Sequence, residues 1–161
     1  MNEHELLRIV QTLTLPGPDV TGDQLEQLTD VFQDEISHPG GTDLLYYPDS
    51  WGLSANPSPQ EIVKEALCWK PRVIAMAVTY VRRHPNRDDL FCYGVEVKGK
   101  IRTQVVSPLK LNVGDICAVA LSGIVLSSGH RVRHGFVDRA YSAGEILGVT
   151  DEPPGVELPV S

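Results

Sequence analysis

The stretch HPGGTDLLYYP, residues 38–48, places four bulky side chains in a row between two prolines. Thr42 is a residue type that caps helices, Asp43 suits the positive end of a helix, and Pro48 ends one. These signals predict a helix of little more than one turn. Successive helical residues are turned by about 100°, so the four residues after Asp43 cover the whole circumference. Because a surface turn buries only part of that circle, at least one of the two tyrosines is expected to be exposed.

Longer helices are predicted on both sides of this stretch. Apolar residues recur with helical spacing over residues 4–15, and the sequence LPGP ends that segment. Thr21, with Gln24 three positions later, forms a capping box and begins a second helix. The stripe of this helix that we expect to be buried comprises Leu25, Leu28, Phe32 and Ile36. A further capping signature at Ser58 begins a helix that ends near Lys70, before a proline.

After Pro71 the pattern changes to short segments rich in β-branched and aromatic residues. These segments are residues 72–81, 91–97, 101–107, 116–127 and 135–141. The sequence Lys98-Gly99-Lys100 predicts a hairpin turn between the second and the third. The predicted fold class is α+β, with a small four-helix bundle in residues 1–70 and a β-rich domain, a small antiparallel sheet or barrel, in residues 71–161. The tail, residues 151–161, is expected to be loose.

Charge is divided unevenly along the chain. The net charge is −7, yet residues 1–70 hold twelve acids against three bases, whereas residues 71–161 hold nine acids against eleven bases. An acidic first half repels nucleic acid and attracts a basic partner. The three cysteines are far apart and are expected to be buried free thiols. Neither a secretory signal nor a membrane-spanning run is recognised, so we expect a cytoplasmic protein.

The first seventy residues resemble the immunity proteins of colicin- and pyocin-type nucleases. Those are small four-helix proteins whose short third helix follows the motif His-Pro-x-Gly-x-Asp-Leu-x-Tyr-Tyr-Pro, and all of its fixed positions occur in residues 38–48. The sequence NPSPQEIVKEALCWK is similar to the family's fourth helix. Trp51 departs from the pattern, because polar residues are expected in that linker; it either packs on the short helix or widens the interface. Residues 71–161 have no counterpart in the family pattern.

The resemblance implies a function and a set of site residues. It implies binding to the basic nuclease domain of a cognate bacteriocin, next to the active site, so that bulk and negative charge exclude the nucleic acid. The shared anchor maps onto Asp43, Tyr46 and Tyr47. The positions that select the partner map onto Gln24, Leu25, Glu26, Thr29, Asp30, Gln33 and Asp34. Leu25 has two interpretations: the resemblance places it among the partner-selecting positions, whereas its helical spacing assigns it to the core. We expect a monomer before binding, with no cofactor, no metal, no membrane contact and no direct contact with nucleic acid.

Two other functions remain open from the sequence. The β-rich half could mediate assembly, which would make the protein a scaffold with the helical half as a docking module. His130, His134 and Asp138 share parity in GHRVRHGFVDRA and together resemble a metal or hydrolytic set. Side chains four positions apart on a strand are about 13 Å apart, which is too far for one ion, so an enzyme is not expected. A basic cluster at residues 82–87 is either a turn rich in solvated charge or a contact for an acidic helix or for nucleic acid.

Overall fold

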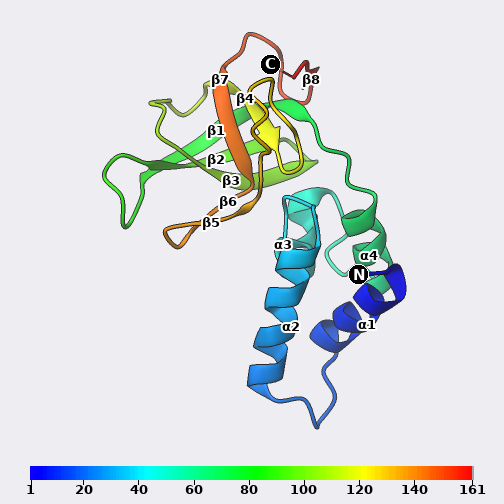
Figure 1. Ribbon diagram of the computed structural model, residues 1–161. Helices are drawn as coiled ribbons and strands as arrows, with labels where there is room; N and C mark the ends of the chain where they lie inside the picture. Colours follow the sequence, from blue (N-terminus) through cyan, green and yellow to red (C-terminus); the bar gives the residue numbers. More distant parts are fainter. Residues whose placement is uncertain (161) are drawn as a thin grey trace. The chain divides into compact units, whose positions relative to one another are not determined.

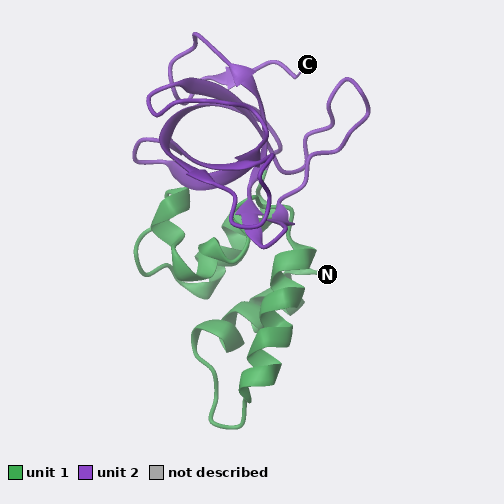
Figure 2. Cartoon of the chain, turned by 90° about the vertical axis from the view of Figure 1, so that its left-hand side faces the viewer, with its two compact units in different colours: residues 1–69 green, residues 70–161 purple. Residues whose placement is uncertain are grey.

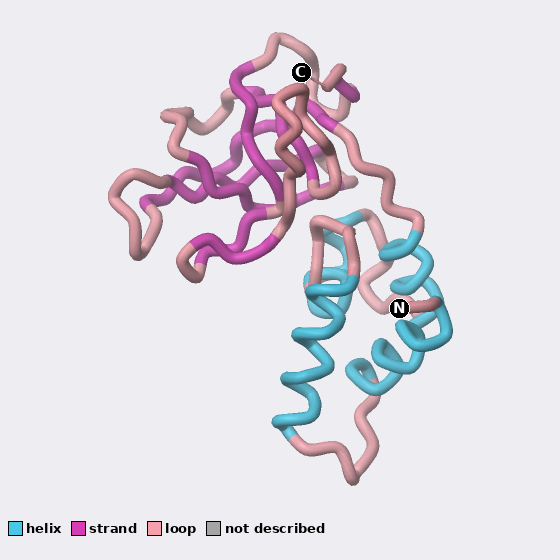
Figure 3. Tube along the Cα trace, in the orientation of Figure 1, coloured by secondary structure: helices cyan, strands magenta, loops and turns pink. Residues whose placement is uncertain are grey.

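Helices make up the first of two units in the chain. The computed structural model describes residues 1–160, and the chain divides into residues 1–69 and residues 70–161 (Figure 2). Figure 3 shows the helices in the first unit and the strands in the second. The helices are α1 (Glu3–Thr14), α2 (Gly22–Glu35), α3 (Asp43–Tyr46), the 3₁₀ helix η1 (Pro48–Trp51) and α4 (Pro59–Leu67), and Figure 1 labels the α-helices. The predicted α+β class and the four α-helices are confirmed.

Local capping explains where the long helices begin. Thr21 and Gln24 form the predicted capping box of α2, and Ser58 with Glu61 forms that of α4. Helix α1 begins at Glu3, one residue before the predicted start, because Asn2 forms a capping box with Glu5. In each box a side-chain oxygen accepts from an N–H that has no partner within the helix.

The first unit has a continuous apolar core. Helix α1 packs on both α2 and α4, and the short helix α3 packs on η1. The buried apolar residues are Leu6, Val10, Phe32, Ile36, Leu44, Trp51, Ile62, Val63 and Ala66. The predicted stripe of α2 is only partly buried, since Phe32 and Ile36 are enclosed whereas Leu25 and Leu28 are half-buried. Helix α2 packs mainly on α1, which leaves its first turns covered on one side.

The second unit is a curled antiparallel sheet. Its strands are β1 (Val73–Arg83), β2 (Phe91–Val97), β3 (Ile101–Ser107), β4 (Ile116–Leu121), β5 (Gly135–Val137), β6 (Ala140–Ser142), β7 (Gly144–Val149) and β8 (Glu157–Leu158). The main order is β3-β2-β1-β4-β7, and β3 also packs beside β7. The sheet therefore closes toward a barrel, which Figure 2 shows as a ring. Register shifts in β1 and β4 assist this curvature.

Most predicted strands are found, and two differ. The hairpin at Lys98-Gly99-Lys100 pairs Val97 with Ile101, and Gly99 has the positive φ of 77° that its turn requires. The predicted strand 116–127 ends at Leu121. Residues 135–141 form parts of two strands, because Asp138 and Arg139 adopt positive φ and turn the chain.

Two strands were not predicted. Strand β7 contains three polar or glycine positions in GEILGV and has no clear alternation, yet it pairs with β4. In the tail that we expected to be loose, Glu157 and Leu158 pair with Ile74 and Val73. The half-buried Leu158 packs on the apolar cluster around Val73, and this contact helps to hold residues 157–158 against β1.

The structure also shows how the cysteines lie and whether any helix could span a membrane. Cys92 and Cys117 are buried free thiols as predicted, whereas Cys68 is exposed because it lies just past the end of α4. Within residues 1–160, no helix has the length and the apolar character needed to cross a membrane.

Candidate functional site

A buried histidine fixes the chain as it enters α3. The His38 side chain is fully buried, and its Nδ1 accepts from the Gly40 N–H at 2.9 Å. Because Nδ1 is an acceptor, the ring proton is on Nε2, which donates to Glu65 Oε1 at 3.1 Å. The His38 ring therefore joins the start of α3 to α4.

A glutamine from α2 holds the first turn of α3. Gln33 Oε1 accepts from the backbone N–H of Thr42 at 2.9 Å. Thr42 occupies the predicted N-cap position, but its side chain makes no capping hydrogen bond. The acceptor at this end of α3 comes from Gln33 instead. Gly41 has a φ of 52°, and a Cβ there would lie 2.3 Å from Gln33 Oε1. Gln33, which the resemblance places among the partner-selecting residues, thus also has an internal role.

Aromatic rings pack beneath α3. The Trp51 ring is buried, and its centroid lies 4.8 Å from that of His38 in an edge-on arrangement. The Trp69 ring contacts both, with its centroid 4.8 Å from that of His38 and 6.1 Å from that of Trp51. A Cβ at Gly40 would lie 2.6 Å from Trp51 Nε1, so glycine is needed where the chain passes over the indole. Of the two roles expected for Trp51, the structure shows packing in the core.

The two tyrosines of α3 face outward. Leu44 is fully buried, so it takes the inner side of this single turn. Tyr46 is 57% exposed and Tyr47 is 63% exposed. The sequence predicted that at least one of them would be exposed, and both are. Two large exposed rings therefore project from consecutive residues of a turn whose backbone is held from α2 and α4.

Asp43 carries a partly desolvated charge beside these rings. Its side chain is half-buried, and burial raises the pKa of the carboxyl above its ordinary value. Within residues 1–160 this carboxylate has no hydrogen-bond or ion-pair partner. A charge that is partly removed from water without a partner is unfavourable in the free protein. A cationic group from outside could offset that cost.

The predicted partner-selecting residues lie along α2 with different exposures. Four of them are exposed, namely Gln24, Glu26, Asp30 and Asp34. The other three, Leu25, Thr29 and Gln33, are half-buried. The Thr29 hydroxyl donates to the Leu25 carbonyl at 2.8 Å, so its polar group is engaged within the helix. The acidic members are the ones most available to a partner.

The histidines of the second unit do not form one site with Asp138. His130 Nε2 bonds Glu145 at 2.8 Å, His134 Nδ1 bonds the Ser122 hydroxyl at 2.9 Å, and Asp138 bonds Arg87 at 2.8 Å. Neither histidine lies on a strand, so the shared parity does not place them on one face. Across residues 1–160, no three His, Cys, Asp or Glu side chains are grouped so that they could hold a metal.

The basic cluster at residues 82–87 is partly internal. His84 is 5% exposed, its Nδ1 accepts from the Asn86 N–H at 3.0 Å, and its Nε2 donates to the Val137 carbonyl at 2.6 Å. This repeats the arrangement at His38, since each histidine precedes a proline and accepts from the N–H two residues on. The recurring His-Pro pair is a sequence signal that could have identified both as structural. Arg87 is held between Asp89 and Asp138.

Comparison with known proteins gives a family match for the N-terminal part of the chain. Residues 1–72 match the family described as colicin immunity protein / pyocin immunity protein. This confirms the resemblance over that segment, which is under half of the chain. The immunity family supports a role in bacteriocin immunity and binding to a bacteriocin toxin, and it is a family of inhibitors that is not typically enzymatic.

A likeness also exists to a solved structure, the C-terminal domain of Plasmodium vivax p43. The identity is 21%, the match covers 47% of this chain and 44% of that one, and the TM-score is 0.37. A likeness this slight carries no argument about fold or function.

Proposed function

We propose that the protein neutralises the cytotoxic nuclease domain of a cognate bacteriocin by binding it through Asp43, Tyr46 and Tyr47. The observation that carries this proposal is the pair of exposed tyrosine rings on α3, 57% and 63% exposed. Tyrosine is enriched among residues that dominate binding energy, because it is large, rigid and amphipathic. Exposed rings on a backbone that is already fixed lose little conformational freedom when a partner covers them.

Helix α2 supplies the charge that selects and steers the partner. A nuclease domain must hold phosphates and is therefore basic, so the acidic first half of this chain attracts it. Asp43 adds a carboxylate that gains a cationic partner on binding. The protein binds next to the nuclease active site and excludes the substrate by bulk and charge. It acts in the cytoplasm, because the nucleic acids that such a toxin attacks are found there. Before binding it is a monomer.

The experiment that tests this function is a cleavage assay. The full chain is added to the cytotoxic domain of the bacteriocin encoded beside its gene, and nucleic-acid cleavage is followed. We expect cleavage to stop at one equivalent of the chain. Undiminished cleavage at a large excess, with both proteins folded, would contradict the proposal.

Reversing charge on α2 should slow association. For Glu26→Lys combined with Asp30→Lys, we expect the association rate with the nuclease domain to fall about tenfold or more at low salt. The loss should shrink as salt screens the charges. Stopped-flow mixing at two ionic strengths measures it. The control makes the same charge change at two exposed acids of the second unit, Asp151→Lys with Glu152→Lys. An equal loss in the control would show that only net charge matters.

Replacing Asp43 by asparagine should separate stability from binding. Burial raises the carboxyl pKa in the folded protein, so the charged form is disfavoured there. Asp43→Asn should therefore leave the free protein at least as stable at neutral pH. Any gain is fully present above the raised folded pKa and disappears below 3.8, where the carboxyl is protonated in both states. Affinity for the nuclease domain should fall. Denaturant unfolding across pH measures the stability, and titration calorimetry measures the affinity. Lower stability at neutral pH with unchanged affinity would contradict this prediction.

A further inference from the structure

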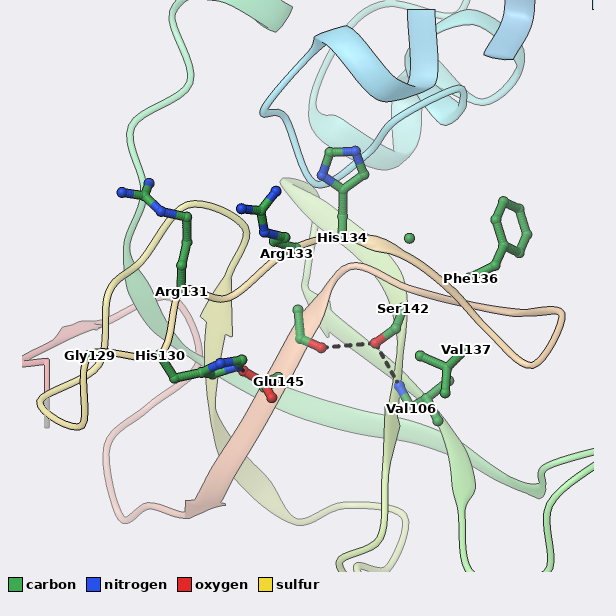
Figure 4. Close-up of a pocket in the computed structure, with 12 residues that line it drawn as sticks. Val106, Gly129, His130, Arg131, Arg133, His134, Phe136, Val137, Ser142 and Glu145 are labelled. Atoms are coloured by element: carbon green, nitrogen blue, oxygen red, sulfur yellow. Dashed lines mark hydrogen bonds and ion pairs between the residues drawn. The ribbon is translucent and has the colours of Figure 1, made fainter. Parts of the chain in front are cut away.

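The second unit contains a hollow that the proposed function does not use. It measures about 610 Å³ and is lined by the segment at residues 129–137, a loop that leads into β5, by Val106 near the end of β3, and by Ser142, Gly144 and Glu145 (Figure 4). The Ser142 hydroxyl joins its walls, since it accepts from the Val106 N–H at 3.0 Å and donates to the Gly144 carbonyl at 2.8 Å. The hollow is thus bounded by hydrogen-bonded strands on one side and by a long loop on the other.

Positive charge gathers at this hollow. Arg131 and Arg133 are exposed, and within residues 1–160 neither side chain has a hydrogen-bond or ion-pair partner. Figure 4 shows both guanidinium groups extending on the same side of the loop. Glu145 is the one acid among the lining residues, and it is bonded to His130 at 2.8 Å. Two free guanidinium groups therefore face solvent beside a carboxylate that is already partnered.

An aromatic ring stands at the edge of the same hollow. Phe136 is 68% exposed, more than either Tyr46 or Tyr47. Its ring packs edge-on against Tyr141, with the centroids 5.4 Å apart. The β5–β6 hairpin that carries it is held at its tip, where His84 donates to the Val137 carbonyl and Asn86 donates to the Asp138 carbonyl at 2.8 Å. The exposed Phe136 side chain is thus carried by a hairpin whose tip is held by hydrogen bonds.

We propose that this hollow binds single-stranded nucleic acid, with phosphates at Arg131 and Arg133 and a base stacked on Phe136. Proteins that bind single strands combine a cationic groove with aromatic side chains on which bases stack. The carboxylates of an acidic peptide would satisfy the guanidinium groups but have no aromatic face to stack on the ring. The acidic first half repels nucleic acid, and the resemblance of that half to immunity proteins implies no direct contact with it. The hollow lies in residues 71–161, which carry eleven bases against nine acids, so the charge that repels nucleic acid belongs to the other half of the chain.

The test uses the full chain and a fluorescein-labelled oligothymidylate of about 12 nucleotides, within the range of known site sizes. Fluorescence anisotropy should rise on binding at low salt. The logarithm of affinity should fall with the logarithm of salt with a slope of about −1.4, as expected for two phosphate contacts on a single strand. Arg131→Gln with Arg133→Gln, and separately Phe136→Ser, should each weaken binding about tenfold.

The matched control is Lys98→Gln with Lys100→Gln, which removes the same charge from the exposed β2–β3 turn and should leave affinity within about twofold. Thermal unfolding verifies that each variant is folded. If the arginine double variant is not folded, Phe136→Ser alone still tests the proposal. A polyglutamate chain of equal charge should not displace the oligonucleotide. The inference is overturned if the anisotropy does not rise, if the arginine pair and the lysine pair have equal effects, or if polyglutamate competes equally well.

Discussion

Replacing Tyr47 by alanine should weaken binding to the cognate nuclease domain by about 2–4 kcal/mol, and Tyr46→Ala should have an effect of similar size. Both rings are more than half exposed in the free protein, so truncation removes contact area from the complex while it creates no cavity in the monomer. The free energy of unfolding should change by less than about 0.5 kcal/mol. Titration calorimetry measures the affinity, and denaturant unfolding measures the stability.

The control for this prediction is Leu67→Ala, at an exposed apolar residue of α4 in the same unit. It should leave affinity unchanged. Phenylalanine at each tyrosine position separates the ring from the hydroxyl, because it keeps the apolar face and removes one hydrogen-bonding group. If alanine at Tyr46 or Tyr47 unfolds the protein and the folded fraction binds normally, the rings are structural and do not anchor a partner.

Replacing His38 by alanine should destabilise the first unit by about 3 kcal/mol or more. The variant leaves a cavity beside the Trp51 and Trp69 rings, and it removes the acceptor of the Gly40 N–H. It also removes the link to Glu65. Chemical denaturation followed by tryptophan fluorescence suits this test, since both tryptophans contact the replaced ring.

His4→Ala is the matched control, because His4 is exposed on α1 and should tolerate the change within about 0.5 kcal/mol. In folded His38→Ala protein, affinity for the nuclease domain should also fall, since α3 loses one of the bonds that fix its entry. A variant as stable as His4→Ala would show that the ring does not hold the entry to α3.

Features set by neighbouring residues were predictable from the sequence. The capping boxes at Thr21 and Ser58 each depend on a partner three residues away, and both were found. The Lys98-Gly99-Lys100 hairpin depends on a local turn and was also found. The exposure of a tyrosine on α3 follows from helical geometry alone, because four bulky residues cannot all face inward on one turn.

Features set by distant residues were not predictable. The Gln33 side chain caps α3 from nine positions earlier in the chain, where a local pattern would assign the task to Thr42. Trp51 is a core residue because the rings of His38 and Trp69 meet it. Strand β7 forms because β4 offers it a partner, and its own sequence lacks a strand pattern. The desolvation of Asp43 likewise depends on its surroundings in the folded unit.

Hydrogen exchange on the complex with the nuclease domain tests the central claim most directly. The exchange of backbone amides is compared in the free chain and in the complex. If α3 is the anchor, the amides of residues 43–47 should gain the greatest protection, accompanied by the exposed face of α2. A tight complex in which these amides exchange as fast as in the free chain, while protection appears elsewhere, would contradict the account.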